Sequence, residues 1–208
     1  MSRARSRTPS NPSGFPGDGS PIWRCSVEIM AISGSLRKVS SNTTLLRAVQ
    51  RLAPEGALIT IYAGLGDLPH FNPDLEGQEP QSVFDLRAQM QKAAGVLICS
   101  PEYAHGVPGV LKNALDWLVG SGETVNKPFA LLNASPRATH AQASLTEILT
   151  TMAAIIVPEA SVTLSLLGKN LDENALLEDP EKSRILQDAL TFFVEYLRSK
   201  ATIISETA

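Results

Sequence analysis

The chain has 208 residues, a formal net charge of −3 and a hydrophobic content of 43%. This length predicts one domain with some extra chain, because an average domain has roughly 150 residues. The apolar content suffices for a core that folds without staples, and no run approaches the ~18 consecutive apolar residues of a membrane span, so we expect no membrane partner.

The N-terminal segment differs in composition from the rest of the chain. Residues 1–24 are rich in Ser, Pro, Gly and Arg and carry few large apolar side chains. Such a segment cannot bury enough surface to offset its ordering entropy. We therefore predict a disordered tail over 1–24, one domain over 25–202 and a C-terminal tail over 203–208. The tail holds four arginines and one aspartate, which leaves an acidic domain with no basic face for nucleic acid.

Cysteine and histidine usage excludes several kinds of site. The two cysteines, Cys25 and Cys99, are far apart, and the three histidines have no second His or Cys at ligand spacing. We expect no metal site and a reducing, cytoplasmic location. Residues 1–24 also lack the apolar run of a secretory signal.

Along the domain, short apolar runs alternate with longer amphipathic segments. The predicted strands cover 27–33, 57–62, 95–100, 127–135 and 155–157. The predicted helices cover 42–53, 83–93, 110–119, 144–154 and 181–199. In the last helix Ile185, Ala189, Phe192 and Tyr196 are expected to face the core, and Pro158 confines the last strand to an edge or an end.

This alternation predicts an α/β domain with a parallel sheet and helices on both faces. A flavodoxin-like, doubly wound, five-stranded sheet suits the order, while other open α/β strand orders remain possible. Ligands of such sheets bind beyond the carboxyl ends of the strands. The candidate loops are therefore 34–42, 101–109 and 136–142.

The loop after the first predicted strand, SGSLRKVSSN (33–42), favours phosphate binding. Backbone N–H groups of a small-residue loop and the following helix N-terminus attract an anion, and Arg37 adds a charge. The loop has neither the Gly-Lys-Ser/Thr of a P-loop nor G-x-G-x-x-G, which disfavours triphosphates and Rossmann-type dinucleotides. The alternative is an ordinary helix cap by Ser40 or Ser41 with Arg37 in solvent. A cap needs only one serine, so the excess favours the anion.

The loop after the third predicted strand begins PEYAHGVPGVLKNALDW (101–117). Two prolines stiffen it, and Gly106 and Gly109 allow backbone to approach a ligand closely. Tyr103 could form an aromatic wall beside a planar heterocycle. A structural turn with Glu102 in solvent explains the same residues equally well.

Together these two motifs resemble the NADPH-dependent FMN reductase family, the flavodoxin-like reductases that include quinone, azo-dye and chromate reductases. The similarity runs over about residues 27–200. It implies a non-covalent FMN whose phosphate is held by the first motif and whose ring lies against main chain of the second, with a small residue after the fourth strand on the other side. The implied cofactor-binding residues are Ser35, Arg37, Ser40, Ser41, Asn42, Pro101, Glu102, Tyr103, Ala104 and Ser135. The family commonly has Asn where this chain has Ala104, which removes one amide contact.

The resemblance also implies ping-pong hydride transfer from NADPH or NADH, through FMN N5, to a quinone, a free flavin, an azo compound or an oxyanion such as chromate. The cofactor carries this chemistry, so no catalytic side chain is required. His105, Gly106 and Arg137 are candidates for nicotinamide or acceptor contacts, although solvated side chains are the commoner case. We interpret 63–81 as a lid or interface loop. Relatives suggest a homodimer or homotetramer.

Two rival functions fit the same fold. One is a flavodoxin-like FMN-binding electron carrier without nicotinamide turnover, and the other is a protein that kept the fold and lost the ligand. Carriers usually have a phosphate loop without Arg and a strongly acidic surface, and the intact motifs argue against ligand loss. A serine hydrolase and a low-molecular-weight phosphatase are disfavoured because the chain lacks G-x-S-x-G and a cysteine before the first loop.

Overall fold

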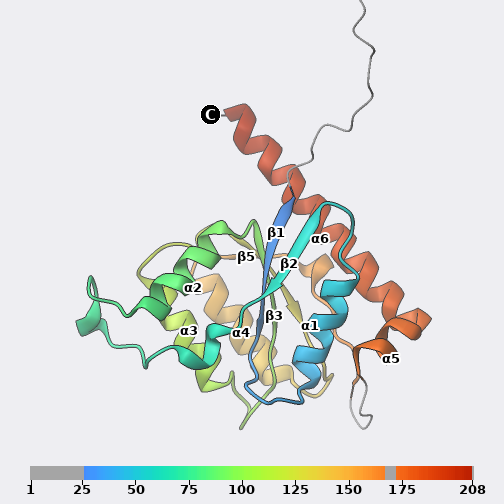
Figure 1. Cartoon of the computed structure of the whole chain (residues 1–208), viewed down its shortest axis with the longest axis horizontal. Helices are drawn as coiled ribbons and strands as arrows, with labels where there is room; N and C mark the ends of the chain where they lie inside the picture. Colours follow the sequence, from blue (N-terminus) through green and yellow to red (C-terminus); the bar gives the residue numbers. More distant parts are fainter. Residues whose placement is uncertain (1–25, 167–171, 208) are drawn as a thin grey trace, which may run out of the picture.

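The computed structural model describes residues 26–166 and 172–207 (Figure 1). Across these residues five parallel strands form one sheet in the order β2-β1-β3-β4-β5. The strands are β1 (Val27–Ser33), β2 (Ala57–Ile61), β3 (Gly95–Cys99), β4 (Pro128–Leu132) and β5 (Ile155–Ile156). This is the strand order of the flavodoxin-like fold, which confirms the predicted class.

Helices cover both faces of the sheet (Figure 1). One face is covered by α1 (Ser41–Arg51), α5 (Glu173–Glu178) and α6 (Pro180–Thr207), and the other by α2 (Gln81–Lys92), α3 (Gly109–Val119) and α4 (Thr139–Thr151). Alternate β1 side chains enter the two cores: Ile29 packs on the α1 side and Met30 on the α3 side. Strands buried on both faces are apolar throughout, which explains the continuous runs in the sequence.

The C-terminal helix differs from its prediction in length and at one core-facing residue. It continues to Thr207, so residues 203–207, predicted as a tail, belong to its backbone. No Gly or Pro follows position 199 to end it. Of the predicted core-facing residues, Ala189 is buried and Ile185 and Tyr196 pack against the core, whereas Phe192 is exposed. Further buried side chains of this helix are Leu186, Leu190, Phe193 and Leu197.

Other predicted boundaries hold to within a few residues, with one informative exception. Helix α4 begins at Thr139, five positions before the predicted start at 144, so part of the predicted loop 136–142 is helical. The short helix α5 was not predicted. β5 lies at a sheet edge, as Pro158 required. The predicted disordered tail over 1–24 lies outside the described residues.

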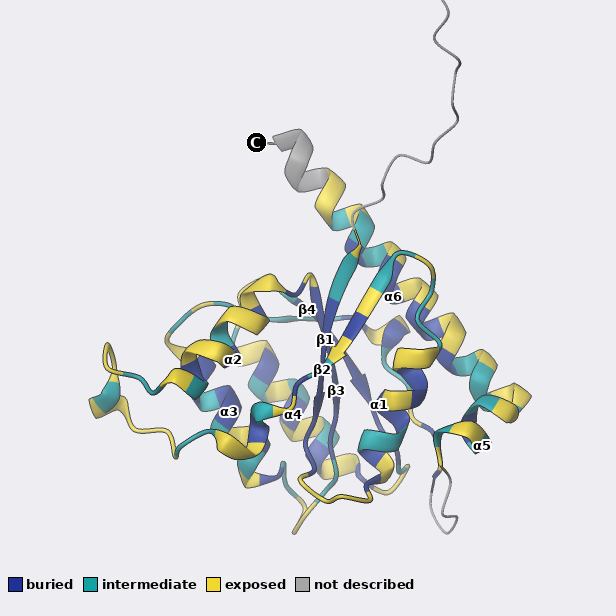
Figure 2. Ribbon diagram, in the orientation of Figure 1, coloured by how far each residue is buried: buried dark blue, intermediate teal, exposed yellow. Residues whose placement is uncertain are grey.

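The carboxyl ends of all five strands meet at one edge of the sheet, where the connecting loops are largely exposed (Figure 2). The C-terminal end of α6 lies at the opposite edge of the sheet (Figure 1). In the part of the chain that the structure describes, no helix is both long and apolar enough to cross a membrane. The parallel sheet thus gathers the three candidate loops at a single edge.

Candidate functional site

The loops after β1 and β3 leave the sheet side by side, where the strand order reverses. Ser33 is paired in register with Cys99, and the Gly34 N–H donates to the Cys99 carbonyl at 2.9 Å. A Cβ on Gly34 would lie 2.7 Å from Ser100 Oγ, closer than any side chain tolerates. This position therefore needs glycine because the two loops approach each other closely.

Hydrogen bonds that involve serine hydroxyl groups stabilise the loop after β1. Ser33 Oγ shares a 2.8 Å hydrogen bond with Thr43 Oγ1 in α1. Ser35 is buried, and its Oγ accepts from the Arg37 N–H at 3.3 Å. The Arg37 side chain remains exposed, with Leu36 beside it 57% exposed. The loop is thus folded back on itself with its cation on the outside.

The N-terminus of α1 faces the same loop. Ser40 is the N-cap, as expected: its Oγ accepts from the Thr43 N–H at 3.5 Å and its carbonyl from the Thr44 N–H at 2.8 Å. The N–H groups of Ser41 and Asn42 precede these two and point out of the helix end, as in the first turn of any helix. They give an anion two donors beside the positive end of the helix dipole.

Asn42 was expected among the cofactor-binding residues, and its side chain has another role. It is 8% exposed, and its Oδ1 accepts from Cys99 Sγ at 3.2 Å. Burial raises the pKa of the Cys99 thiol well above its usual range. The amide oxygen therefore ties α1 to β3 beneath the loop, which leaves the backbone N–H of Asn42 for a ligand.

The loop after β3 contains a tight two-residue turn. Tyr103 and Gly106 exchange two backbone hydrogen bonds, of 3.2 and 3.0 Å. The residues between them, Ala104 and His105, both have positive φ, 48° and 58°. This is the backbone of a hairpin turn that favours Asn and Gly. Tyr103 itself is 53% exposed, so its ring is accessible at the site edge.

Two contacts tie this turn to the start of α4. Glu102 Oε2 accepts from the Ala141 N–H at 2.8 Å. The rings of His105 and His140 stack with centroids 4.2 Å apart and an interplanar angle of 5°. The Glu102 side chain is therefore engaged by the helix N-terminus rather than left in solvent. This carboxylate also explains why α4 starts early, since Ala138 at the N-cap position makes no side-chain cap.

The loop after β4 is organised by a buried asparagine. Asn133 is 4% exposed, and its Oδ1 accepts from the Ser135 N–H at 3.0 Å. Ser135 Oγ accepts in turn from the Arg137 N–H at 3.3 Å. Ser135 is half-buried and the Arg137 side chain is exposed. Both lie on the carboxyl edge, beside the helix that Glu102 caps.

An open hollow of about 480 Å³ joins the first two loops. Its lining residues are Gly34, Leu36, Arg37, Tyr103, Pro108, Gly109 and Val110. A Cβ on Gly109 would meet no atom within 4 Å, so backbone is open to a ligand there. The volume lies within the roughly 300–1,000 Å³ of small-molecule sites. A guanidinium at one side and a phenol ring at the other suit a phosphate and a planar heterocycle.

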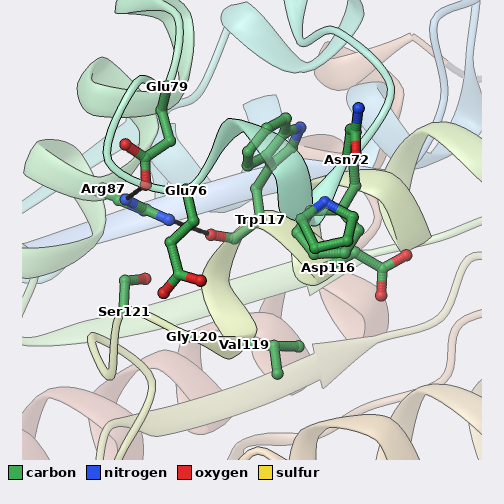
Figure 3. A pocket seen from close by; sticks show the side chains of 11 residues that line it. Asn72, Glu76, Glu79, Arg87, Asp116, Trp117, Val119, Gly120 and Ser121 are labelled. Carbon is green, nitrogen blue, oxygen red and sulfur yellow. Dashed lines mark hydrogen bonds and ion pairs between the residues drawn. The ribbon is translucent and has the colours of Figure 1, made fainter.

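A second hollow, of about 210 Å³, lies away from these loops (Figure 3). This hollow lies between residues 69–80 and the helices α2 and α3. Arg87 crosses it, bonding Glu79 at 2.7 Å and the Trp117 carbonyl at 3.1 Å. The pKa of Glu79 is lowered, mainly by a hydrogen bond from the Glu79 backbone and next by the hydrogen bond from Arg87. The Trp117 Nε1–H donates to the Pro69 carbonyl at 2.8 Å, so this segment is fastened to α3.

Two of the predicted cofactor residues, Arg37 and Tyr103, line the hollow at the switch point, and the others lie on the loops around it. Sequence reasoning missed Asn133, His140 as a ring partner, and the Glu102 cap. Asn133 carries a signal, because an amide inside the apolar run LLNAS is unusual. The other two connect residues about 35 to 40 positions apart in the chain and left no local pattern. Among the described residues no group of three or more His, Cys, Asp or Glu could hold a metal ion.

A parallel sheet in this order, with an anion-type loop and an aromatic loop meeting at the switch point, defines a flavodoxin-like protein built to bind FMN. The family model described as NADPH-dependent FMN reductase matches residues 27–167. The chain therefore belongs to the NADPH-dependent FMN reductase family, which makes it a flavoenzyme that works with FMN and NAD(P)H.

Curated relatives carry reductase names. The chain is 32% identical over 183 residues to the NADH:(hydroxy)cinnamate reductase subunit CrdA of Vibrio ruber, covering 85% of this chain and 90% of that protein. It is 28% identical over 180 residues to a 2-hydroxy-1,4-benzoquinone reductase from Burkholderia sp., covering 84% and 98%. A quinone reductase of Pseudomonas putida is 39% identical over 116 residues, covering 53% and 61%.

Solved structures agree on the fold. FerB, a flavoenzyme NAD(P)H:(acceptor) oxidoreductase from Paracoccus denitrificans, superposes with a TM-score of 0.67 at 30% identity, covering 83% of this chain and 97% of that one. The apo form of the NADH:FMN oxidoreductase EMOB superposes with a TM-score of 0.56 at 18% identity, covering 80% and 88%, and supports the fold alone.

Proposed function

We propose that this enzyme transfers a hydride from NADPH or NADH, by way of FMN bound at the hollow between the first two loops, to a small oxidised acceptor. A quinone is the favoured acceptor, because relatives are named for quinone reduction. Free flavins, azo compounds and oxyanions such as chromate are the further candidates. The observation that carries the proposal is the hollow itself, which places Arg37 and Tyr103 on one cavity at the switch point.

In this proposal the loop after β1 binds the phosphate of FMN. The N–H groups of Ser41 and Asn42 donate to a phosphate at the helix N-terminus, and Arg37 supplies the balancing charge. Ser35 and Ser40 are buried and shape the loop from beneath. The loop stays in place on its own hydrogen bonds, so little ordering accompanies binding.

In this proposal the loops after β3 and β4 contact the ring of FMN. Main chain of Pro101, Glu102 and Tyr103 meets one edge of the heterocycle, with the turn at Ala104 closing the loop and Ser135 on the other side. FMN, when bound, supplies the hydride acceptor and donor chemistry at its N5. The protein's task is to orient the ring, supply backbone donors and leave one ring face open.

The exposed side chains beside that face are candidates for the nicotinamide and the acceptor. His105 and Arg137 are exposed on neighbouring loops, and Gly106 follows the turn. Arg137 fits an anionic group of the nicotinamide dinucleotide or of the acceptor. One open face used in turn by two substrates gives ping-pong kinetics.

The proposed function is tested by the colour of the protein. The purified enzyme, loaded with FMN, should show the yellow flavin spectrum and bleach when NADPH or NADH is added without oxygen. A benzoquinone added next should restore the colour. Bleaching without reoxidation by any acceptor class would remove the acceptor assignment. A protein that stays yellow with both nicotinamides would be an electron carrier, and one that rejects FMN would overturn the proposal.

We further propose a homodimer or homotetramer in the cytoplasm. Phe71 is 42% exposed and Val119 63% exposed, and both line the hollow under residues 69–80. Exposed apolar side chains around a hollow suit a subunit contact, and the predicted interface role of 63–81 points to the same region. The buried free thiol of Cys99 fits a reducing compartment. Light scattering of the wild type and of Val119→Asp tests the assembly: a larger species that dissociates in the variant supports this contact, and a monomeric wild type contradicts it.

A further inference from the structure

The turn that carries Tyr103 adopts a backbone that its own sequence disfavours. Ala104 and His105 have φ of 48° and 58°, a region where Asn, Asp and His are enriched among the residues other than Gly and where Ala is disfavoured. Two backbone hydrogen bonds close the turn, but Gly, the best residue for its second position, is absent. Contacts from outside the loop must therefore help to hold this shape.

Those contacts come from the start of α4. His140 stacks flat on His105, the second residue of the turn, with ring centroids 4.2 Å apart. Glu102, just ahead of the turn, accepts from the Ala141 N–H at 2.8 Å. The adjacent α4 residues His140 and Ala141 therefore contact the loop at His105 and at Glu102. Ala138, at the N-cap position of α4, makes no side-chain cap.

We propose that His140 is a positioning residue for the cofactor loop. This inference rests on the proposed placement of FMN against residues 101–106. His140 acts through His105: the stack holds the left-handed turn, and the turn sets the main chain of Tyr103 against the ring. Glu102 fixes the same loop through a contact that involves no imidazole.

The test is the FMN dissociation constant of the full chain, measured by quenching of flavin fluorescence at pH 8. His140→Ala should weaken binding about two- to tenfold, the range of a lost aromatic pair. His140→Phe should keep wild-type affinity, because a phenyl ring can stack on His105 in the same place.

A rescue separates positioning from a direct contact. Ala104→Gly relieves the positive φ without adding a side chain. In the His140→Ala background it should restore most of the lost affinity, while a direct His140 contact to the cofactor would leave the loss in place. His70→Ala, at the third histidine of the chain, is the matched control and should leave the affinity unchanged.

The outcomes distinguish this inference from the proposed function. If Arg37→Ala weakens FMN binding while His140→Ala does not, FMN binds at the hollow and His140 has no positioning role. If neither change has an effect, FMN binds elsewhere and the proposed placement fails as well. A His140→Phe variant that binds FMN as weakly as His140→Ala would show that the ring stack does not hold the turn.

Discussion

The two loops that meet at the switch point are built in opposite ways. The loop after β1 is supported from below: Ser35, Ser40 and Asn42 are buried, and their side chains bond the loop, α1 and β3. The turn after β3 is exposed at Tyr103, and its backbone is held by contacts to α4.

This difference indicates a division of labour within one site. A preformed anion site gives affinity at little entropic cost, because its donors are already oriented. A turn held by a few outside contacts can be adjusted by substitution without disturbing the sheet. Changes at the buried residues of the first loop should therefore alter binding and stability together, and changes in the second loop should alter ring positioning with smaller energies.

The largest effect is expected at Gly34. Gly34→Val forces a side chain against Ser100, whose Oγ would lie 2.7 Å from the new Cβ. Overpacking of this kind costs about 3 kcal/mol, and it separates the two loops, so FMN binding should be lost as well. Chemical denaturation and FMN titration measure both. Gly120→Ala is the control, since a Cβ there meets nothing within 4 Å; equal behaviour of the two variants would contradict the close approach.

Arg37→Ala tests the exposed part of the same loop. The side chain lines the hollow and is not used to build the loop. Losing a charge-assisted phosphate contact should cost about 1.5–3 kcal/mol of binding, roughly ten- to a hundredfold in FMN affinity. The melting temperature of the FMN-free protein should not change. Lys38→Ala, at the neighbouring exposed cation, is the control, and unchanged affinity in Arg37→Ala would remove that side chain from the phosphate site.

A smaller effect, of opposite sign, is expected in the turn. Ala104→Asn places a residue that tolerates positive φ at a position with φ of 48°. The change should stabilise the protein by about 0.5–1 kcal/mol, whereas Ala104→Val should destabilise it. Thermal unfolding of the FMN-free protein gives the comparison. A melting temperature that does not respond to either change would show that the turn is unstrained.

The smallest effect concerns the thiol beneath the first loop. Burial raises the pKa of Cys99, so the thiol stays protonated at pH values where an unfolded cysteine ionises. In a Cys25→Ser background, alkylation of the native protein should stay slow from pH 7 to pH 9, while in denaturant the rate rises with pH. Rapid native labelling that follows pH would mean that the first loop opens readily.

The sequence predicted the sheet, its helices and the positions of the loops because both-face burial and helical spacing are local signals. It failed at one residue of α6, where Phe192 is exposed and the neighbouring Phe193 is buried. Positions 185, 189, 192, 196 and 186, 190, 193, 197 are neighbouring stripes with the same spacing, so only packing selects between adjacent residues. The early start of α4 was missed for a similar reason, because its cap comes from Glu102 in a distant loop.

Within the site, residue types were more predictable than their roles. Arg37 and Tyr103 were expected at the ligand and line the hollow. Asn42 was expected there too, and its side chain instead meets Cys99. A loop sequence states which polar groups are present, but only the register of β1 against β3 decides which of them turn inward.

The carboxylate that caps a helix from another loop also bears on protein engineering. Transplanting residues 101–106 from a relative without Glu102 and His105 would remove the carboxylate partner of the Ala141 N–H and the ring that His140 covers. Loop and helix start therefore form one exchangeable module, and chimeras should move 101–106 together with 138–141.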